Sequence, residues 1–489
     1  MSLQSVFQKS FSFGDLKPVV VEVSDAAMTS DAGLIPIRQF DQVIGLSQRF
    51  AGALDDSRDP TRTRHTLLEM VRVRMYGILA GYEDQDDHDT LRSDPVFKLI
   101  ADRSPDADDL ASQPTHSRFE NAVSVRSLLR LRDVFIEQFI ASFEEPPASL
   151  TLDMDPFDDP AHGQQQLIMF HGYYGQYQYL PRVITCAEND QVVMFCLLFG
   201  TANPTLGADD DLEYLLGRLR AAWPEVRIHL RADSAFGVPL MFDVCERLSI
   251  DYSFGVRMNA TLKKASDDLL SGAMQTFDET GQPQRQFESL DYQAGSWRSP
   301  RWTIIKVEAH AQGTNRRAIV TSRPGARVLS AAAYDEYADR GESENRNKEL
   351  KRELKADRLS DHRYMANLFR LALHCAAHNL LTQLRRVVAD PPAWSASVPF
   401  ESNASDPSVC EPQALPEPAR HRWFSRRRRK DPLGEGHACT WQTRLIKVAA
   451  QVRVSSRRIL VRISGTWPHL PHYEQVSEAV LSLPSVRSG

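Results

Sequence analysis

The strongest constraint on the fold is an alternation of strand-like and helix-like segments over residues 149–256. Residues 149–155 (SLTLDMD) alternate apolar and polar side chains, which is typical of a strand with one buried face. Strands that alternate with helices indicate an α/β sheet with at least some parallel pairing. Strands are predicted at 149–155, 179–186, 191–199, 226–232 and 251–256, and helices at 210–222 and 239–248.

The regions on either side of this sheet have other patterns. Apolar residues recur at helical spacing before the Glu144-Glu145-Pro146-Pro147 breaker, so residues 1–147 are predicted to be an N-terminal all-helical domain. Residues 258–325 are interpreted as an inserted β subdomain, with β-type segments at 274–277, 301–307 and 317–322. This insertion separates the two parts of the core, 148–257 and 326–388, and helices are predicted at 330–355 and 364–386.

Charge is distributed unevenly along the chain. The net charge of −6 argues against a simple basic nucleic-acid binder. Residues 1–150, however, hold 16 Lys and Arg against 24 Asp and Glu, whereas residues 401–489 hold 14 against 8. The last region, 389–489, comprises a linker rich in Pro and Ser, a basic run at 426–430 (RRRRK) and a small folded piece at 441–463. An acidic front and a basic tail favour a partner with a strong field of its own.

Targeting and redox patterns are missing from the sequence. No segment reaches the roughly 20 apolar residues that span a bilayer, and the N-terminus lacks the charged start and apolar core of a signal peptide. The six cysteines form no C-x-x-C pair, so a zinc site or a disulfide framework is not expected. We therefore expect a cytoplasmic protein with no membrane partner.

Three acidic features occupy positions that an α/β sheet can bring together. Asp155 ends one predicted strand, Asp233 ends another, and Glu344 lies on the predicted helix at 330–355. Ligand sites in open α/β sheets gather at the carboxyl ends of the strands. Carboxylate oxygens there would suit Mg²⁺, or Mn²⁺ in its place. Two such ions can activate a nucleophile and stabilise the leaving oxygen of a phosphoryl displacement.

The predicted helix carries a stripe of functional side chains around Glu344. At 100° per residue, Glu344 and Lys351 fall about 40° and 20° from Arg340, and Tyr337 falls about 60° away. One helix face thus combines a carboxylate with two cations and a phenol. Cations beside a metal carboxylate could hold phosphate groups.

These residues resemble a known family. The spacing Tyr337-x2-Arg340-x3-Glu344-x6-Lys351 matches the Y-R-E-K signature of bacterial insertion-sequence DDE transposases. The segments LDMD, DDPAHGQ, HGYY and RADS look like one branch of that family, and the resemblance runs over about residues 100–385. It implies an RNase H-like core with a β insertion before the Glu.

The resemblance also implies roles for individual residues. Asp155, Asp233 and Glu344 would be the catalytic ligands of two Mg²⁺ ions. Tyr337, Arg340 and Lys351 would contact phosphates near the transposon end. Trp297, or alternatively Trp302, would stack on a base flipped out near the cleavage point.

The implied activity is DNA transposition. The enzyme would cut double-stranded DNA at the terminal inverted repeats of its element and join the 3′-OH ends to target DNA. The N-terminal domain and the basic tail would recognise the ends, and synapsis of two ends implies a homodimer. An inactive or domesticated descendant that only binds DNA is one alternative, and another RNase H-like nuclease is a second.

Two residue assignments stay open at this point. Asp153 and Asp155 have the same parity on their strand, so alternation cannot separate them, although Asp155 is nearer the carboxyl end. Asp155 is followed by Pro156-Phe157, whereas the family typically has Asp-x-Thr. Glu342 is a rival to Glu344, but it falls about 200° away from Arg340 on the helix.

Overall fold

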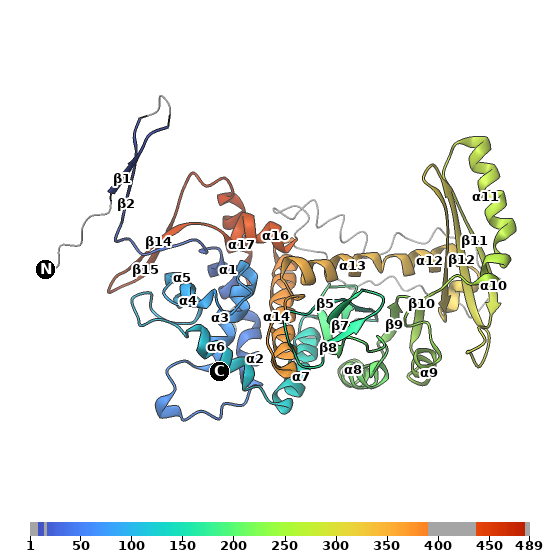
Figure 1. Ribbon diagram of the computed structural model, residues 1–489, viewed down its shortest axis with the longest axis horizontal. Coiled ribbons are helices and arrows are strands. Elements are labelled where there is room, and N and C mark those ends of the chain that lie inside the picture. Colours follow the sequence, from blue (N-terminus) through green and yellow to red (C-terminus); the bar gives the residue numbers. More distant parts are fainter. Residues whose placement is uncertain (1–7, 14–16, 390–436, 485–489) are drawn as a thin grey trace.

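The computed structural model describes residues 8–13, 17–389 and 437–484. The molecule is elongated (Figure 1): N-terminal helices and C-terminal elements form one end, a mixed sheet occupies the middle, and three long strands with helix α11 (Asp267–Thr280) form the other end. The basic run at 426–430 and most of the predicted linker lie outside the described residues. None of the described helices is both long and apolar enough to cross a bilayer.

The sheet has ten strands in the described part of the chain. They are β4 (Ser149–Pro156), β5 (Asp159–Pro160), β6 (Met169–His171), β7 (Gln176–Cys186), β8 (Val192–Phe199), β9 (Arg227–Ala232), β10 (Asp251–Val256), β11 (Gln284–Tyr292), β12 (Arg301–His310) and β13 (Gly313–Thr321). Their order is β11-β12-β13-β10-β9-β4-β7-β5, and β6 and β8 also pair with β7. β9 is parallel to β4 and β10, and the other pairs are antiparallel.

The alternation in β4 sorts its side chains onto two faces of the sheet. Leu150, Leu152 and Met154 are buried in an apolar layer with helices α8 (Ala208–Ala222) and α9 (Pro239–Arg247). The polar residues between them face helices α12 (Ser330–Ala338) and α13 (Gly341–Lys348), which run along the sheet (Figure 1). The alternation in β4 therefore gives this part of the sheet one apolar face and one charged face.

The first and last parts of the chain share one hydrophobic core with helix α14 (Tyr364–Ala389). Trp441 is fully buried in it, and β3 (Met28–Thr29) pairs with β14 (Ala450–Val454). Gly33 marks the closest approach, because an added Cβ would lie 1.9 Å from the carbonyl oxygen of Leu445. The N-terminal elements are β1 (Gln8–Phe11), β2 (Val19–Glu22), β3 (Met28–Thr29), α1 (Leu34–Ile44), α2 (Leu46–Gly52), η1 (Pro60–Arg62), α3 (Leu67–Ala80), α4 (His88–Leu91), α5 (Pro95–Ile100), α6 (Gln113–Asn121) and α7 (Val125–Ala141). The C-terminal elements are α16 (Ala438–Trp441), η4 (Gln442–Ile446), β14 (Ala450–Val454), β15 (Ile459–Ile463) and α17 (Leu470–Leu481).

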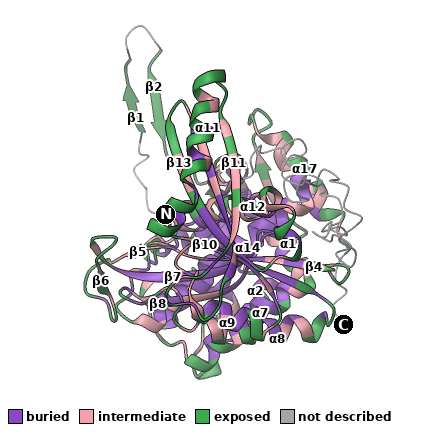
Figure 2. Ribbon diagram, turned by 90° about the vertical axis from the view of Figure 1, so that its right-hand side faces the viewer, coloured by how far each residue is buried: buried purple, intermediate pink, exposed green. Residues whose placement is uncertain are grey.

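The predicted alternation over 149–256 is confirmed for every element, with the largest difference at the start of β7. The prediction that residues 1–147 are all helical was wrong at the N-terminus. β1 and β2 form an exposed ribbon that projects from the body (Figure 2), and β3 joins a small sheet with the C-terminal strands.

The region 258–325 also differs from the predicted β subdomain. It starts with two helices, α10 (Ala260–Ala265) and α11, and the strand predicted at 274–277 lies inside α11. Leu270 and Ala273 are buried three residues apart, which is helical spacing. Strands β11 to β13 then extend the central sheet through the β13–β10 pair instead of forming a separate sheet.

Candidate active site

The charged face of β4 and β9 separates the two aspartates that alternation left open. Asp153 and Arg231 are register partners, and they form a buried two-bond ion pair with N–O distances of 2.7 and 2.8 Å. Both carboxylate oxygens of Asp153 are thereby engaged. Asp155 and Asp233 each lie one residue beyond the next register pair, Met154 and Ala232, so they lie side by side at the carboxyl ends of the two strands.

Asp155 lies in crowded negative surroundings. Burial raises its pKa to about 7; Arg340 opposes the rise, Asp233 adds to it, and Glu344 adds a smaller part. Asp233 is oriented by its own turn, where its Oδ1 accepts a hydrogen bond of 2.8 Å from the backbone N–H of Ala235. Asp233 and Glu344 thus both lie near enough to Asp155 to oppose its ionisation.

Arg340 occupies the junction between α12 and α13 and faces two of these carboxylates. Its Nη2 is 2.5 Å from Oε1 of Glu344, and its Nη1 is 3.6 Å from Oδ1 of Asp155. Burial alone would lower the pKa of Arg340, but Tyr337, Asp155 and Glu344 raise it overall. The guanidinium therefore stays charged between the carboxylates. The side chain of Glu342, the rival to Glu344, lies outside the described residues.

Tyr337 packs where α12 crosses the sheet. A Cβ added at Gly255 in β10 would lie 2.9 Å from the Tyr337 hydroxyl and 2.9 Å from the backbone nitrogen of Ser234. Glycine is thus required for the hydroxyl to approach the turn that carries Asp233. Burial raises the pKa of Tyr337.

Asn347 is a site residue that the sequence patterns did not predict. Its Nδ2 donates a hydrogen bond of 2.8 Å to Oδ2 of Asp155. It lies three residues after Glu344 and seven after Arg340, so the helical spacing that linked those residues could also have found it. The amide fixes one carboxylate oxygen and leaves the other facing Arg340.

The stripe continues past α13 in a π-helical turn, η3 (Glu349–Glu353). Lys351 lies in this turn and forms an ion pair with Asp158, part of the DDPAHGQ segment. Burial strongly raises the pKa of the neighbouring Asp159. The predicted helix at 330–355 is therefore three consecutive pieces, and it still brings Tyr337, Arg340, Glu344 and Lys351 along the charged face.

Of the two candidate stacking residues, Trp297 is buried and Trp302 is half-buried. Trp297 is only 6% exposed, and its ring contacts Phe242 and Tyr292 at centroid distances of 5.0 and 5.3 Å. A ring this deeply buried among the described residues is not available to a flipped base, contrary to the expectation for Trp297. Trp302 donates from its indole nitrogen to Ala326 at 3.1 Å, and Arg327 covers one ring face at 4.3 Å.

Three carboxylates at the strand ends and on the helix have the oxygen chemistry of a divalent-cation site, and Arg340 now lies between two of them. Asp155, Asp233 and Glu344 offer carboxylate oxygens, which hard cations such as Mg²⁺ prefer. Among the described residues, the group whose ligand atoms all lie within 4.8 Å of one another is a different one, Glu349, Glu353 and His437. Glu349 in that group is ion-paired with Arg346 and Arg385 and accepts the backbone N–H of Ala438, so its oxygens tie three segments together.

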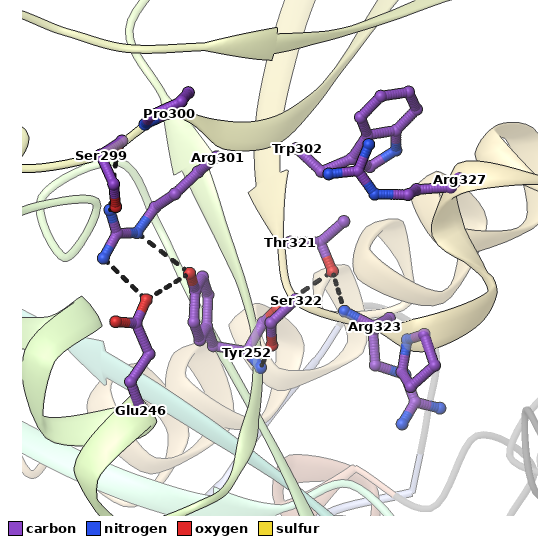
Figure 3. Close-up of a pocket in the computed structure, with 11 residues that line it drawn as sticks. Glu246, Tyr252, Ser299, Pro300, Arg301, Trp302, Thr321, Ser322, Arg323 and Arg327 are labelled. Carbon is purple, nitrogen blue, oxygen red and sulfur yellow. Dashed lines mark hydrogen bonds and ion pairs between the residues drawn. The ribbon is translucent and has the colours of Figure 1, made fainter.

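A pocket of about 300 Å³ lies at the other end of the strands (Figure 3). It is lined at the start of β10 by Tyr252, at the start of β12 by Arg301 and after the end of β13 by Arg323. Arg301 pairs with Glu246 at 2.7 Å, and Arg323 pairs with Asp251 at 3.0 Å. The pocket and the candidate active site therefore lie at opposite ends of the parallel strands.

Comparison with known proteins identifies the family. Residues 11–398 match the family described as transposase DDE domain group 1, so the chain belongs to this family of DNA transposases. No protein with a curated description matches the sequence significantly. Among solved structures, a piggyBac transposase in a synaptic complex with hairpin DNA aligns with 95% of this chain and 89% of that chain, at 13% identity and a TM-score of 0.37. A TM-score this low does not establish a shared fold.

Proposed function

We propose that this chain is the transposase of a bacterial insertion sequence, which cuts DNA at the ends of its element and joins the 3′-OH ends to target DNA. One observation carries the proposal: in a member of a DDE transposase family, Asp155 and Asp233 lie at two adjacent strand ends, and Arg340 lies between Asp155 and Glu344 of the helix. Asp155, Asp233 and Glu344 would be the catalytic metal ligands.

The strand order supports an RNase H-like core. The strands β8-β7-β4-β9-β10 follow one another across the sheet, with β9 and β10 parallel to β4. Helix α8 connects β8 to β9, and α9 connects β9 to β10. We take these elements as the core, with residues 258–325 as the segment between Asp233 and Glu344.

Two bound Mg²⁺ ions, or Mn²⁺, would supply an activated water or 3′-OH and stabilise the leaving oxygen. The chain itself would hold the phosphodiester in place. Arg340 and Lys351 now pair with carboxylates, and they would turn part of their hydrogen-bonding capacity to phosphate oxygens when DNA enters. The Tyr337 hydroxyl would be a further phosphate contact.

The DNA partners follow from the same proposal. The N-terminal helices and the basic run at 426–430 would contact terminal inverted repeats, and two chains would assemble as a homodimer to hold two ends. Because the contacts are to phosphates, binding would weaken as salt rises.

The decisive experiment is a cleavage assay on the element's own ends with Mg²⁺. We expect Asp233→Asn to lower cleavage by more than about a hundredfold, since even outer-shell partners of metal ligands cost 10–100-fold. Asp268→Asn, an exposed aspartate on α11, is the matched control and should cut normally.

Binding of the same ends, measured in EDTA, should persist in Asp233→Asn. An Asp233→Asn enzyme that cuts like the parent would refute the proposed function. A parent that binds the ends but never cuts them would instead favour an inactive, DNA-binding descendant.

A further inference from the structure

A hairpin next to the candidate site exposes aromatic side chains to solvent. β6 and β7 are joined by residues 172–175 (GYYG), and the turn is closed by the Gly175 N–H donating to the His171 carbonyl at 2.8 Å. Tyr173 is 87% exposed, Tyr177 59% and Phe170 50%. Figure 2 shows β6 at an exposed edge, while most of β7 is buried. Clustered aromatic residues exposed in this way indicate a binding surface.

The hairpin projects past the carboxylates. β4 runs toward Asp155, and β7 is antiparallel to it, so β7 begins beyond the carboxyl end of β4. Gln176 Nε2 donates to Asp158 at 3.2 Å, and Asp158 is the partner of Lys351. The pKa of Tyr174 is raised by burial, then by Asp158, and also by Asp155 and Asp233, which agrees with a position beside the site.

The base of the hairpin is closely packed. A Cβ added at Gly200, just after β8, would lie 2.2 Å from the Gln178 carbonyl oxygen and 2.4 Å from that of Met169. β6, β7 and the end of β8 are thus in close backbone contact. The rings at the tip also brace one another: Tyr173 and Tyr174 lie 5.1 Å apart between centroids, and Phe170 and Tyr177 lie 5.5 Å apart.

The chemistry of the surface selects its ligand. Residues 167–177 include no Asp, Glu, Lys or Arg, so the tip offers no permanently charged group for a phosphate or an ion. It offers flat rings, which stack on nucleobases of any sequence. We propose that the β6–β7 tip stacks on unpaired nucleobases of the DNA strand that is processed at the carboxylates. The inference rests on the proposed function, because that function places DNA at the carboxyl ends of β4 and β9.

The test is DNA binding by the full chain in EDTA, where no cleavage occurs. The probes are a short duplex, the same duplex with an unpaired thymidine arm, and the armed duplex with abasic sites in place of the thymines. We expect the parent to prefer the thymidine arm by roughly tenfold for each base that stacks. The double variant Tyr173→Ala/Tyr177→Ala should lose this preference and keep its affinity for the plain duplex.

Two further variants sharpen the test. Tyr173→Trp/Tyr177→Trp keeps flat rings and should keep the preference for the arm. Phe13→Ala removes an exposed aromatic from the N-terminal ribbon region, far along the chain from the hairpin, and should behave like the parent.

Equal preference for the arm in the parent and in the double alanine variant would overturn the proposal, as would tight binding of the abasic arm. A double variant that loses only its oligomeric state would overturn it too and assign the tip to a protein contact. The readout is independent of catalysis: an enzyme that prefers the arm but cannot cut its ends refutes the proposed function alone, and one that cuts normally without any preference refutes the stacking alone.

Discussion

Asp153 and Asp155 lie on the same face of β4 but in different electrostatic surroundings. Asp153 is buried and neutralised by Arg231, which also donates to the backbone carbonyl of Glu336 on α12. Asp155 instead faces Arg340 at 3.6 Å, and that guanidinium is shared with Glu344. Asp153 is therefore a structural carboxylate, whereas the surroundings of Asp155, two positions further along β4, oppose its ionisation.

Substitution by asparagine should separate these roles. Asp153→Asn leaves a buried guanidinium without its countercharge, so we expect a loss of about 3–5 kcal/mol in the free energy of unfolding. Asp155→Asn removes a carboxylate whose pKa is raised, and ionisation of such a group destabilises the folded state. At pH 8 in EDTA this variant should therefore be at least as stable as the parent, although it should no longer cleave DNA.

Urea unfolding at pH 8 measures both values. If Asp155→Asn proved the less stable of the two variants, the assignment of Asp153 as the structural residue would be wrong.

At the scale of the elements, local sequence patterns predicted single strands and helices but not which distant strands pair. The alternation in 149–155 and the apolar spacing in 210–222 were sufficient to predict β4 and α8, because each pattern reflects burial against one neighbouring layer. Apolar residues 274 and 277 did not distinguish strand from helix over four residues, and the structure has helix there. Nothing in the pattern of 284–321 shows that β13 will pair with β10, since that partner is chosen by contacts distant in sequence.

The candidate site follows the same division. The stripe Tyr337, Arg340 and Glu344 could be predicted, because helix geometry fixes which residues share a face. The pairing of Asp153 with Arg231 could not, because it depends on the register between β4 and β9. The burial of Trp297 likewise depends on where the end of β11 meets α9.

The contact between β10 and α12 gives a prediction at this scale. Gly255→Ala places a methyl group 2.9 Å from the Tyr337 hydroxyl and from the Ser234 backbone nitrogen, so the helix or the Asp233 turn must shift. A displacement of about 1 Å at a catalytic group can cost roughly a hundredfold in rate, and we expect a fall in cleavage of this order. Over-packing should also lower the free energy of unfolding by about 1–3 kcal/mol.

Gly272→Ala on α11 is the matched control, since no atom of the described residues lies within 4 Å of the added methyl group. It should cut DNA normally and gain about 1 kcal/mol of stability from better helix propensity. Normal cleavage and stability in Gly255→Ala, measured by the same assay and by urea unfolding, would show that the approach of Tyr337 to this turn is unimportant.

For the whole molecule, buried polar groups join segments that are far apart in sequence. Glu120 on α6 lies between Arg74 on α3 and Arg370 on α14; burial alone would raise its pKa, but the two arginines lower it to about 2. Glu349 joins Arg346, Arg385 of α14 and the backbone of Ala438 in the C-terminal region. The N-terminal helices, α14 and the C-terminal elements should therefore unfold together rather than as separate domains.

Three histidines in this shared core make its stability depend on pH. Burial lowers the pKa of His116 and His374 to about 3 and that of His378 to about 4. The folded protein keeps these rings neutral, whereas the unfolded chain protonates them below about pH 6.5. The unfolded state therefore binds more protons between these values, and each ring lowers stability by up to about 1.4 kcal/mol for every pH unit below about 6.5.

His116→Leu isolates one of these contributions, because neither ring nitrogen of His116 has a hydrogen-bond partner in the described part of the protein. As pH falls from about 6.5 to about 4, the stability of the variant relative to the parent should rise by about 1.4 kcal/mol per pH unit. The comparison is needed because Asp155, with its raised pKa, acts in the opposite direction over the same range. His162→Leu changes an exposed histidine and should run parallel to the parent in urea unfolding at each pH. Parallel curves for His116→Leu and the parent would mean that His116 is solvated or protonated in the folded protein, contrary to the burial that defines this core.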